Sequence, residues 1–225
     1  FPLKFFTVPP LGTIQYHPSL LPKHRGASAM NWAIIQGETK TGLTIFWPDQ
    51  GIDTGPILLQ KEVIITPEDT LGTLYFNKLF PMGVEAMSEA VTLVKQGLAP
   101  KISQDESQAT YEGLCNDDQS VIEWSRPAHE VFNLIRGTDP QPGATTFWKD
   151  KQIKLFAATL CEEPGRGNPG EILKVDESGI TVMAEGKAIC LGRIQPQGMK
   201  KMPPAEYAQL AGLETSNMFK PTLQK

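Results

Sequence analysis

The sequence predicts an α/β protein in two parts: a layer of strands and helices, then a small β-barrel. Three observations predict it. The first part runs strand, helix, strand, strand, long helix, which is the rhythm of an α/β layer. The second part holds five short strands separated by turns, which is typical of a barrel or rolled sheet. A polar stretch at residues 101–112 separates the two. We therefore expect domains at 1–114 and 115–225, a division that 225 residues can accommodate.

The first part begins with a short strand and a helix. Residues 12–16 are expected to form a strand that runs into a proline-containing loop at 17–26. Ser28 is placed to cap a helix that reaches Ile35, and Gly37 is placed to end it.

Two further strands and a long helix follow. The strands, at 41–47 and 56–65, are rich in β-branched and aromatic residues. The helix begins at Thr66 or Asp69 and ends near Gly97, because apolar residues recur every three or four positions between them. Pro81 interrupts the pattern and is expected to kink the helix. Three strands leave exposed sheet edges, so this layer is incomplete as an α/β domain.

The second part is predicted to contain one amphipathic helix and a five-stranded sheet. The helix spans residues 127–136 and stops at Gly137. The five strands are expected at 143–148, 152–159, 170–175, 179–184 and 188–194.

Two segments carry candidate chemistry, each beyond the end of a predicted strand. One begins Tyr-His-Pro-Ser-Leu-Leu-Pro and contains His17; the other is Asp-Gln-Gly-Ile-Asp-Thr-Gly and contains Asp53. In open α/β sheets ligands bind at the carboxyl ends of strands. A histidine and an aspartate there form an acid–base pair, in which we expect the carboxylate to raise the pKa of His17 toward neutrality or above. From spacing alone, the competing interpretation is that His17 has only a structural role and that Asp53 only forms a turn.

The two segments resemble the signature of the folate-dependent formyltransferase family. The matching strings are His-Pro-Ser-Leu-Leu-Pro, then Arg-Gly-Ala, and later Gly-Ile-Asp-Thr-Gly-Pro, in family order. Within the family the resemblance is greatest to the hydrolase domain of 10-formyltetrahydrofolate dehydrogenases, through Arg-Gly-Ala-Ser-Ala, Thr-Ile-Phe-Trp and Ala-Thr-Tyr-Glu-Gly. It covers nearly the whole chain. It implies the C-terminal half of a Rossmann-like formyltransferase domain, followed by a β-barrel-like (OB-like) C-terminal domain.

The resemblance also implies roles for particular residues. Asp53 would orient and polarise a water or an amine for attack on the formyl carbon of 10-formyltetrahydrofolate. His17 would stabilise the oxyanion and protonate the departing N10 nitrogen. Gln15 stands where transferases of the family carry a catalytic Asn; its amide can donate the same bond, but its side chain is longer. The implied substrate contacts are Phe1, Leu20, Leu21, Pro22, Trp47, Asp49, Gly51 and Gly55.

The implied reaction is left open by Gln15, because the hydrolase domains carry an aliphatic residue there. Hydrolysis of 10-formyltetrahydrofolate to tetrahydrofolate and formate is the first hypothesis. Formyl transfer to an amine, above all methionyl-tRNA, is the second, and an inactive folate-binding domain is the third. Family members carry further strands before the position of Phe1, so we expect this chain to be a piece of a longer protein. A C-terminal aldehyde dehydrogenase portion, the part that would bind NADP, is not among these residues.

Composition limits the partners. The net charge is −4 overall. Residues 115–225 hold 13 Lys plus Arg against 14 Asp plus Glu, or −1, whereas a tRNA-binding surface is usually basic. A local patch at Lys149, Lys151 and Lys154 is the candidate exception. Three widely spaced cysteines without a zinc-ligand pattern predict no metal site. No long apolar run or signal segment is found, so we expect a cytoplasmic protein without membrane contact.

Overall fold

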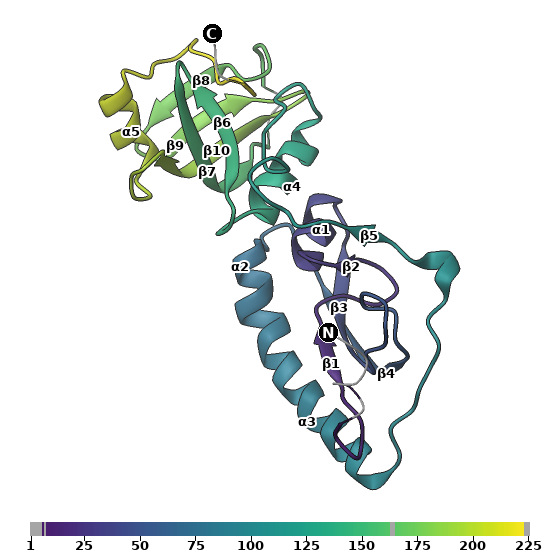
Figure 1. Cartoon of the computed structure of the whole chain (residues 1–225). Helices are drawn as coiled ribbons and strands as arrows, with labels where there is room; N and C mark the ends of the chain where they lie inside the picture. Colours follow the sequence, from purple (N-terminus) through teal and green to yellow (C-terminus); the bar gives the residue numbers. More distant parts are fainter. Residues whose placement is uncertain (1–5, 7, 163–164, 223–225) are drawn as a thin grey trace. The chain divides into compact units, whose positions relative to one another are not determined.

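The computed structural model describes residues 6, 8–162 and 165–222, and divides the chain into two compact units. The first unit comprises residues 1–33 and 38–114, and the second comprises 34–37 and 115–225. The fold is mixed α/β with a separate all-antiparallel sheet in the second unit (Figure 1).

The first unit is built on a three-stranded sheet in the order β1-β3-β4. Both pairs are antiparallel. A second, two-stranded sheet pairs β2 with β5 in parallel. The strands are β1 (Gln15–His17), β2 (Arg25–Gly26), β3 (Lys40–Phe46), β4 (Ile57–Ile64) and β5 (Tyr111–Glu112).

The helices of this unit are α1 (Ala29–Ile35), α2 (Leu71–Leu74) and α3 (Phe80–Gln96), with a π-helical turn η2 (Tyr75–Leu79) and a 3₁₀ turn η3 (Glu106–Gln108). The cap of the long helix is Thr70, not Thr66 or Asp69, because Thr70 and Thr73 satisfy each other's backbone N–H groups in a capping box. The helix continues through η2 into α3. Pro81 lies in the first turn of α3, where its missing N–H costs little. Gly97 ends α3 at φ 70°.

The two faces of the three-stranded sheet have different roles. Tyr16 lies opposite Ile45 in the register, and both belong to the apolar face that packs against α3, together with the buried Leu43 (Figure 1). Side chains alternate along a strand, so His17 and its register partner Thr44 lie on the other face. The sheet thus supports a core on one side and polar side chains on the other.

The second unit is a five-stranded antiparallel sheet in the order β6-β7-β10-β9-β8. Its strands are β6 (Ala144–Trp148), β7 (Lys151–Leu160), β8 (Ile172–Asp176), β9 (Gly179–Met183) and β10 (Ala188–Pro196). The expected five strands are all present. Helix α4 (Ala128–Gly137) was expected, whereas α5 (Pro204–Ala211) was not.

The C-terminal segment links the two edges of this sheet. Phe147 of β6 bridges Lys220, and Glu171, next to β8, bridges Met218. Phe219 lies between these two contacts, is 1% exposed and stacks on Trp124. The sheet thereby wraps around one apolar core that includes Ile135, Leu155 and Ile189, as the prediction of a small barrel requires.

Candidate active site

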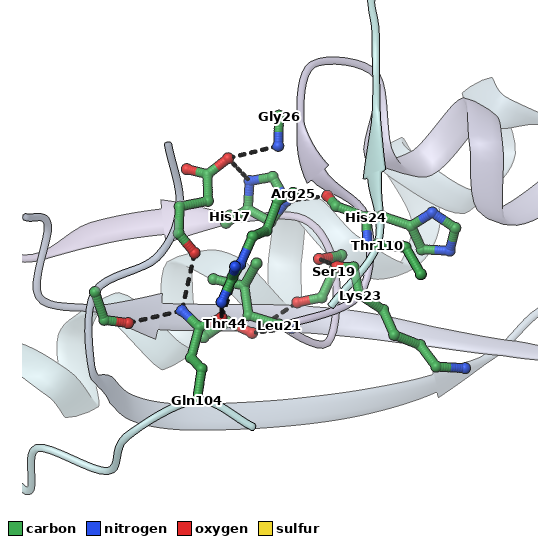
Figure 2. A network of polar contacts seen from close by, with 12 residues as sticks. His17, Ser19, Leu21, Lys23, His24, Arg25, Gly26, Thr44, Gln104 and Thr110 are labelled. Carbon is green, nitrogen blue, oxygen red and sulfur yellow. Dashed lines mark hydrogen bonds and ion pairs between the residues drawn. The ribbon is translucent and has the colours of Figure 1, made fainter. Parts of the chain in front are cut away.

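The structure brings His17 and Asp53 together. His17 ends β1, and Asp53 lies in the loop between β3 and β4. The Nδ1 atom of His17 is 3.5 Å from Oδ2 of Asp53, and both side chains are buried, with 6% and 9% exposed (Figure 2). The same carboxylate oxygen accepts the backbone N–H of Gly26 at 2.8 Å.

The route by which the two meet differs from the expected one. Adjacent parallel strands would present both carboxyl ends at one sheet edge, but β1 and β3 are antiparallel, so their carboxyl ends point in opposite directions. The loop after β3 therefore has to fold back across the sheet to bring Asp53 to His17. Asp53 adopts φ 57°, a left-handed conformation that aspartate tolerates better than most residues.

Gln104 holds this loop in place. Its side-chain amide donates to the backbone carbonyls of Asp53, at 2.8 Å, and Gly55, at 2.7 Å (Figure 2). Arg25 donates to the amide oxygen of Gln104 at 2.8 Å and also pairs with Glu106. A chain of polar contacts thus runs from residues 104–106 to the backbone that carries Asp53.

The second ring nitrogen of His17 is also engaged. Nε2 donates to the carbonyl oxygen of His24 at 2.7 Å, so Nδ1 is the nitrogen that faces Asp53. The expected pKa of His17 is wrong in direction. Burial lowers it, and the neighbouring Asp53 carboxylate raises it by less than burial lowers it.

Thr44 anchors the loop that follows His17. Its hydroxyl donates to the Ser19 carbonyl at 2.7 Å and accepts the N–H of Leu21 at 3.1 Å. Gln60, on β4, donates to the Thr44 hydroxyl and to the Leu21 carbonyl. The loop is therefore tied to the polar face of the sheet at several points.

The remaining predicted site residues have varied surroundings. Gln15 is exposed and lies on the same strand face as His17, two residues away. Leu21 is 2% exposed, whereas Leu20 and Pro22 are partly buried. Phe1 lies outside the described residues.

The residues of the β3–β4 loop are ordered by their own contacts. Trp47 donates its indole N–H to the Pro100 carbonyl at 2.9 Å. Asp49 accepts the N–H of Gly51 and the hydroxyl of Thr54. Gly55 has no room for a side chain, because a Cβ there would lie 1.7 Å from the Trp47 carbonyl oxygen. Sequence reasoning missed four residues that hold the site together: Thr44, Gln60, Gln104 and Thr110. Thr44 and Thr110 lie within family strings, whereas Gln60 and Gln104 lie in no motif that could have drawn attention to them.

The described residues hold neither a metal-ligand cluster nor a membrane-spanning helix. Among residues 6, 8–162 and 165–222, no three His, Cys, Asp or Glu side chains are grouped as metal ligands. No helix in that part of the chain is long and apolar enough to span a bilayer.

Taken together, the fold and the site define a protein with a buried histidine–aspartate pair on an α/β unit, followed by a β-barrel unit. Residues 1–91 match the formyl transferase family model, and residues 115–212 match the model of its C-terminal domain. The chain belongs to the formyl transferase family.

Individual relatives support the same assignment. The chain is 40% identical over 218 residues to the cytosolic 10-formyltetrahydrofolate dehydrogenase of Mus musculus, a match that covers 92% of this chain and 24% of that protein. It is 39% identical over 211 residues to the methionyl-tRNA formyltransferase of Syntrophus aciditrophicus (strain SB), covering 94% of this chain and 67% of that one. The chain thus spans about a quarter of the length of the dehydrogenases it matches.

Solved structures share the fold. HypX from Aquifex aeolicus, in complex with tetrahydrofolic acid, has a TM-score of 0.73 at 23% identity, covering 87% of this chain and 34% of that one. An N-formyltransferase from Helicobacter canadensis, in complex with folinic acid and dTDP-3-aminofucose, has a TM-score of 0.66 at 23% identity, covering 81% and 65%.

Proposed function

We propose that this chain hydrolyses 10-formyltetrahydrofolate to tetrahydrofolate and formate, as the hydrolase part of a 10-formyltetrahydrofolate dehydrogenase-like protein in the cytoplasm. In this proposal residues 1–114 are the catalytic domain and residues 115–225 are the formyltransferase C-terminal domain. The observation that carries it is the buried pair formed by His17 and Asp53, 3.5 Å apart. Identity of about 40% to dehydrogenases across 92% of this chain supports hydrolysis as the reaction.

The proposed mechanism follows from the protonation state of His17. Its pKa is lowered, so the ring starts neutral, with its proton on Nε2 and a lone pair on Nδ1. Nδ1 takes a proton from the attacking water as the water oxygen bonds to the formyl carbon. The Asp53 carboxylate orients that water and stabilises the imidazolium that forms. Nδ1 then returns the proton to N10 as the carbon–nitrogen bond breaks, which releases tetrahydrofolate and formic acid. The acid loses its proton to solvent to give formate.

The folate would lie on the polar side of the three-stranded sheet. We assign Phe1, Leu20, Leu21 and Pro22 to its contacts from one side, and Trp47, Asp49, Gly51 and Gly55 from the other. The exposed amide of Gln15, on the same strand face as His17, would reach the formyl oxygen. In this arrangement the two loops enclose the reacting carbon between His17 and Asp53.

Formyl transfer to an amine is the second candidate, favoured by the 39% identity to a methionyl-tRNA formyltransferase over 67% of its length. The charge of the second unit gives it little support. Of the candidate basic patch, Lys154 already pairs with Asp117 at 2.7 Å, and Lys149 lies over the ring of Trp148. Salt-dependent tRNA binding would need cations that are not already paired.

One experiment separates the candidates. The complete protein that carries this chain is incubated with 10-formyltetrahydrofolate, with and without methionyl-tRNA, and tetrahydrofolate release is followed. Release without tRNA supports hydrolysis, release only with tRNA supports transfer, and binding without release in either case identifies an inactive folate-binding domain.

Variants then test the residues. His17→Asn and Asp53→Asn should each lower turnover by a factor on the order of a hundred or more, because each removes a proton-transfer or charge-stabilising group. His129→Asn and Asp150→Asn are matched controls, since both residues are exposed in the second unit. Turnover by His17→Asn at the level of His129→Asn would contradict the assigned role.

A further inference from the structure

A second histidine lies directly behind His17. His24 is 2% exposed, and its ring lies between two carboxylates. Nε2 is 3.3 Å from Oε1 of Glu38, and Nδ1 is 3.1 Å from Oε2 of Glu112. The three residues come from three segments of the first unit: the loop after β1, the turn after α1, and β5.

The main chain of His24 connects this cluster to the catalytic pair. Its carbonyl oxygen accepts the Nε2–H of His17 at 2.7 Å, and its N–H donates to the Thr110 hydroxyl at 2.8 Å (Figure 2). His24 adopts φ 54°, a conformation that a residue other than glycine keeps only when its surroundings hold it. Both the side chain and the backbone of His24 are therefore fixed from outside the loop.

We propose that His24, held between Glu38 and Glu112, is a positioning residue that fixes the Nε2–H tautomer of His17. The proposal rests on the function proposed above, because it concerns the nitrogen that takes part in that reaction. With the His24 carbonyl in place, the proton of neutral His17 stays on Nε2. The lone pair of Nδ1 is then on the side of the ring that faces Asp53, where the attacking water of the proposed reaction would bind. If the carbonyl moves, Nε2 loses its acceptor, and the Asp53 carboxylate beside Nδ1 then favours the other tautomer.

The charges around His24 make this arrangement depend on pH. The groups that face it are Glu38, Glu112, His17 and, through Glu38, Lys23. Burial lowers the pKa of His24, but the two carboxylates outweigh burial and raise it above its usual value. Both ring nitrogens carry a proton only in the imidazolium form, in which Nδ1 donates to Glu112 and the charged ring pairs with Glu38. The ring loses one of these protons as the pH rises through the raised pKa.

Two variants test the proposal in the full chain. His24→Asn tolerates a positive φ but cannot reach both carboxylates. Glu38→Gln/Glu112→Gln keeps the ring and removes the charges. The matched control is Glu62→Gln/Glu89→Gln, which removes two exposed glutamates that pair with lysines of the same unit.

Each variant is measured in three ways. ¹⁵N NMR of the imidazoles reports the tautomer of His17, steady-state kinetics separates kcat from KM, and thermal unfolding reports stability. We expect His24→Asn to mix the two tautomers of His17 and to lower kcat by roughly tenfold or more, with KM for the folate little changed, as loss of an orienting partner does. The double glutamine variant should move the alkaline fall of kcat to lower pH, and the control should match the parent chain.

A folded His24→Asn chain with an unchanged His17 tautomer and an unchanged kcat would overturn the proposal. If His24→Asn does not fold, the double glutamine variant decides: an unmoved alkaline limb together with an unchanged tautomer overturns it. Lower stability alone, with the tautomer intact, would assign His24 a purely structural role and also overturn it. If the parent chain releases no tetrahydrofolate, the proposed function fails, and the NMR measurement still decides whether His24 positions His17.

Discussion

Individual side chains in the site are governed by burial as much as by charge. An aspartate beside a histidine normally raises the histidine pKa, yet His17 is only 6% exposed, and the loss of hydration outweighs the attraction of Asp53. His24 shows the opposite balance, because two carboxylates flank it instead of one. The number of carboxylates around each ring thus decides whether its pKa is lowered, as in His17, or raised, as in His24.

The pH dependence of hydrolysis should reflect this difference. Neutral His17 is the form that accepts the proton, and its pKa lies below the usual 6.5. As pH falls, kcat/KM should therefore stay level through 6.5 and decrease only at more acidic values. The measurement is a kcat/KM profile with 10-formyl-5,8-dideazafolate, which has no N5 to capture the formyl group.

Asp53→Asn is informative in the same assay. The Asp53 carboxylate raises the pKa of His17, so its removal should lower that pKa further. The acid limb of the residual kcat/KM profile should therefore move to a lower pH than in the parent chain. An acid limb above 6.5 in the parent chain would show that His17 works in its protonated form.

At the scale of secondary-structure elements, the site depends on a loop that leaves its strand and returns over the sheet. Because β1 and β3 are antiparallel, pairing alone does not bring His17 and Asp53 together. The two bonds from Gln104 to the carbonyls of Asp53 and Gly55 supply the missing constraint. The loop is thus positioned by a residue about fifty positions further along the chain.

Replacement of Gln104 tests this constraint. Gln104→Ala leaves two loop carbonyls without their donor and should lower the free energy of unfolding by about 1–3 kcal/mol. It should also decrease kcat, since Asp53 loses its fixed place. Urea unfolding and steady-state kinetics measure the two effects, and Gln108→Ala, an exposed glutamine in the same segment, is the control. Equal kinetics for the two variants would mean that Gln104 does not position the loop.

At the scale of the whole molecule, the two units have separate cores. The core of the first includes Leu43, Ile45 and Leu58 under α3, and the core of the second includes Ile135, Leu155 and Ile189 inside the curved sheet. The residues assigned to the chemistry all belong to the first unit. Substitutions in the core of the second unit should therefore change stability without changing turnover.

Ile189→Ala separates the two properties. Ile189 is fully buried in β10, and truncation to alanine should lower the free energy of unfolding by about 2–5 kcal/mol. Turnover per folded molecule should stay that of the parent chain, because no group of the proposed site is touched. Calorimetry and active-site titration measure these quantities, with the exposed Leu210→Ala as control. A large decrease in kcat of the folded variant would show that the second unit acts on the chemistry.

Much of the fold was predictable because its signals are local. The period of apolar residues indicated the long helix, Gly97 its end, and the spacing of β-branched runs the five strands of the second unit. The elements that were missed are short or weakly patterned, such as β2, β5 and α5. Strand β2 pairs with β5, with Arg25 opposite Tyr111, and local propensity does not encode a contact between residues so far apart in the sequence.

The sequence by itself determined the family, the order of the elements and the two residues on which the proposed chemistry depends, because these are written in strings of adjacent residues. The tertiary structure decided how the strands pair, which side chains hold the Asp53 loop, and in which direction the pKa of each of the two histidines is shifted. These properties depend on contacts between residues far apart in sequence and on the loss of water around them. His24 and Glu112 are 88 positions apart in the sequence, and they form an ion pair only when the chain is folded.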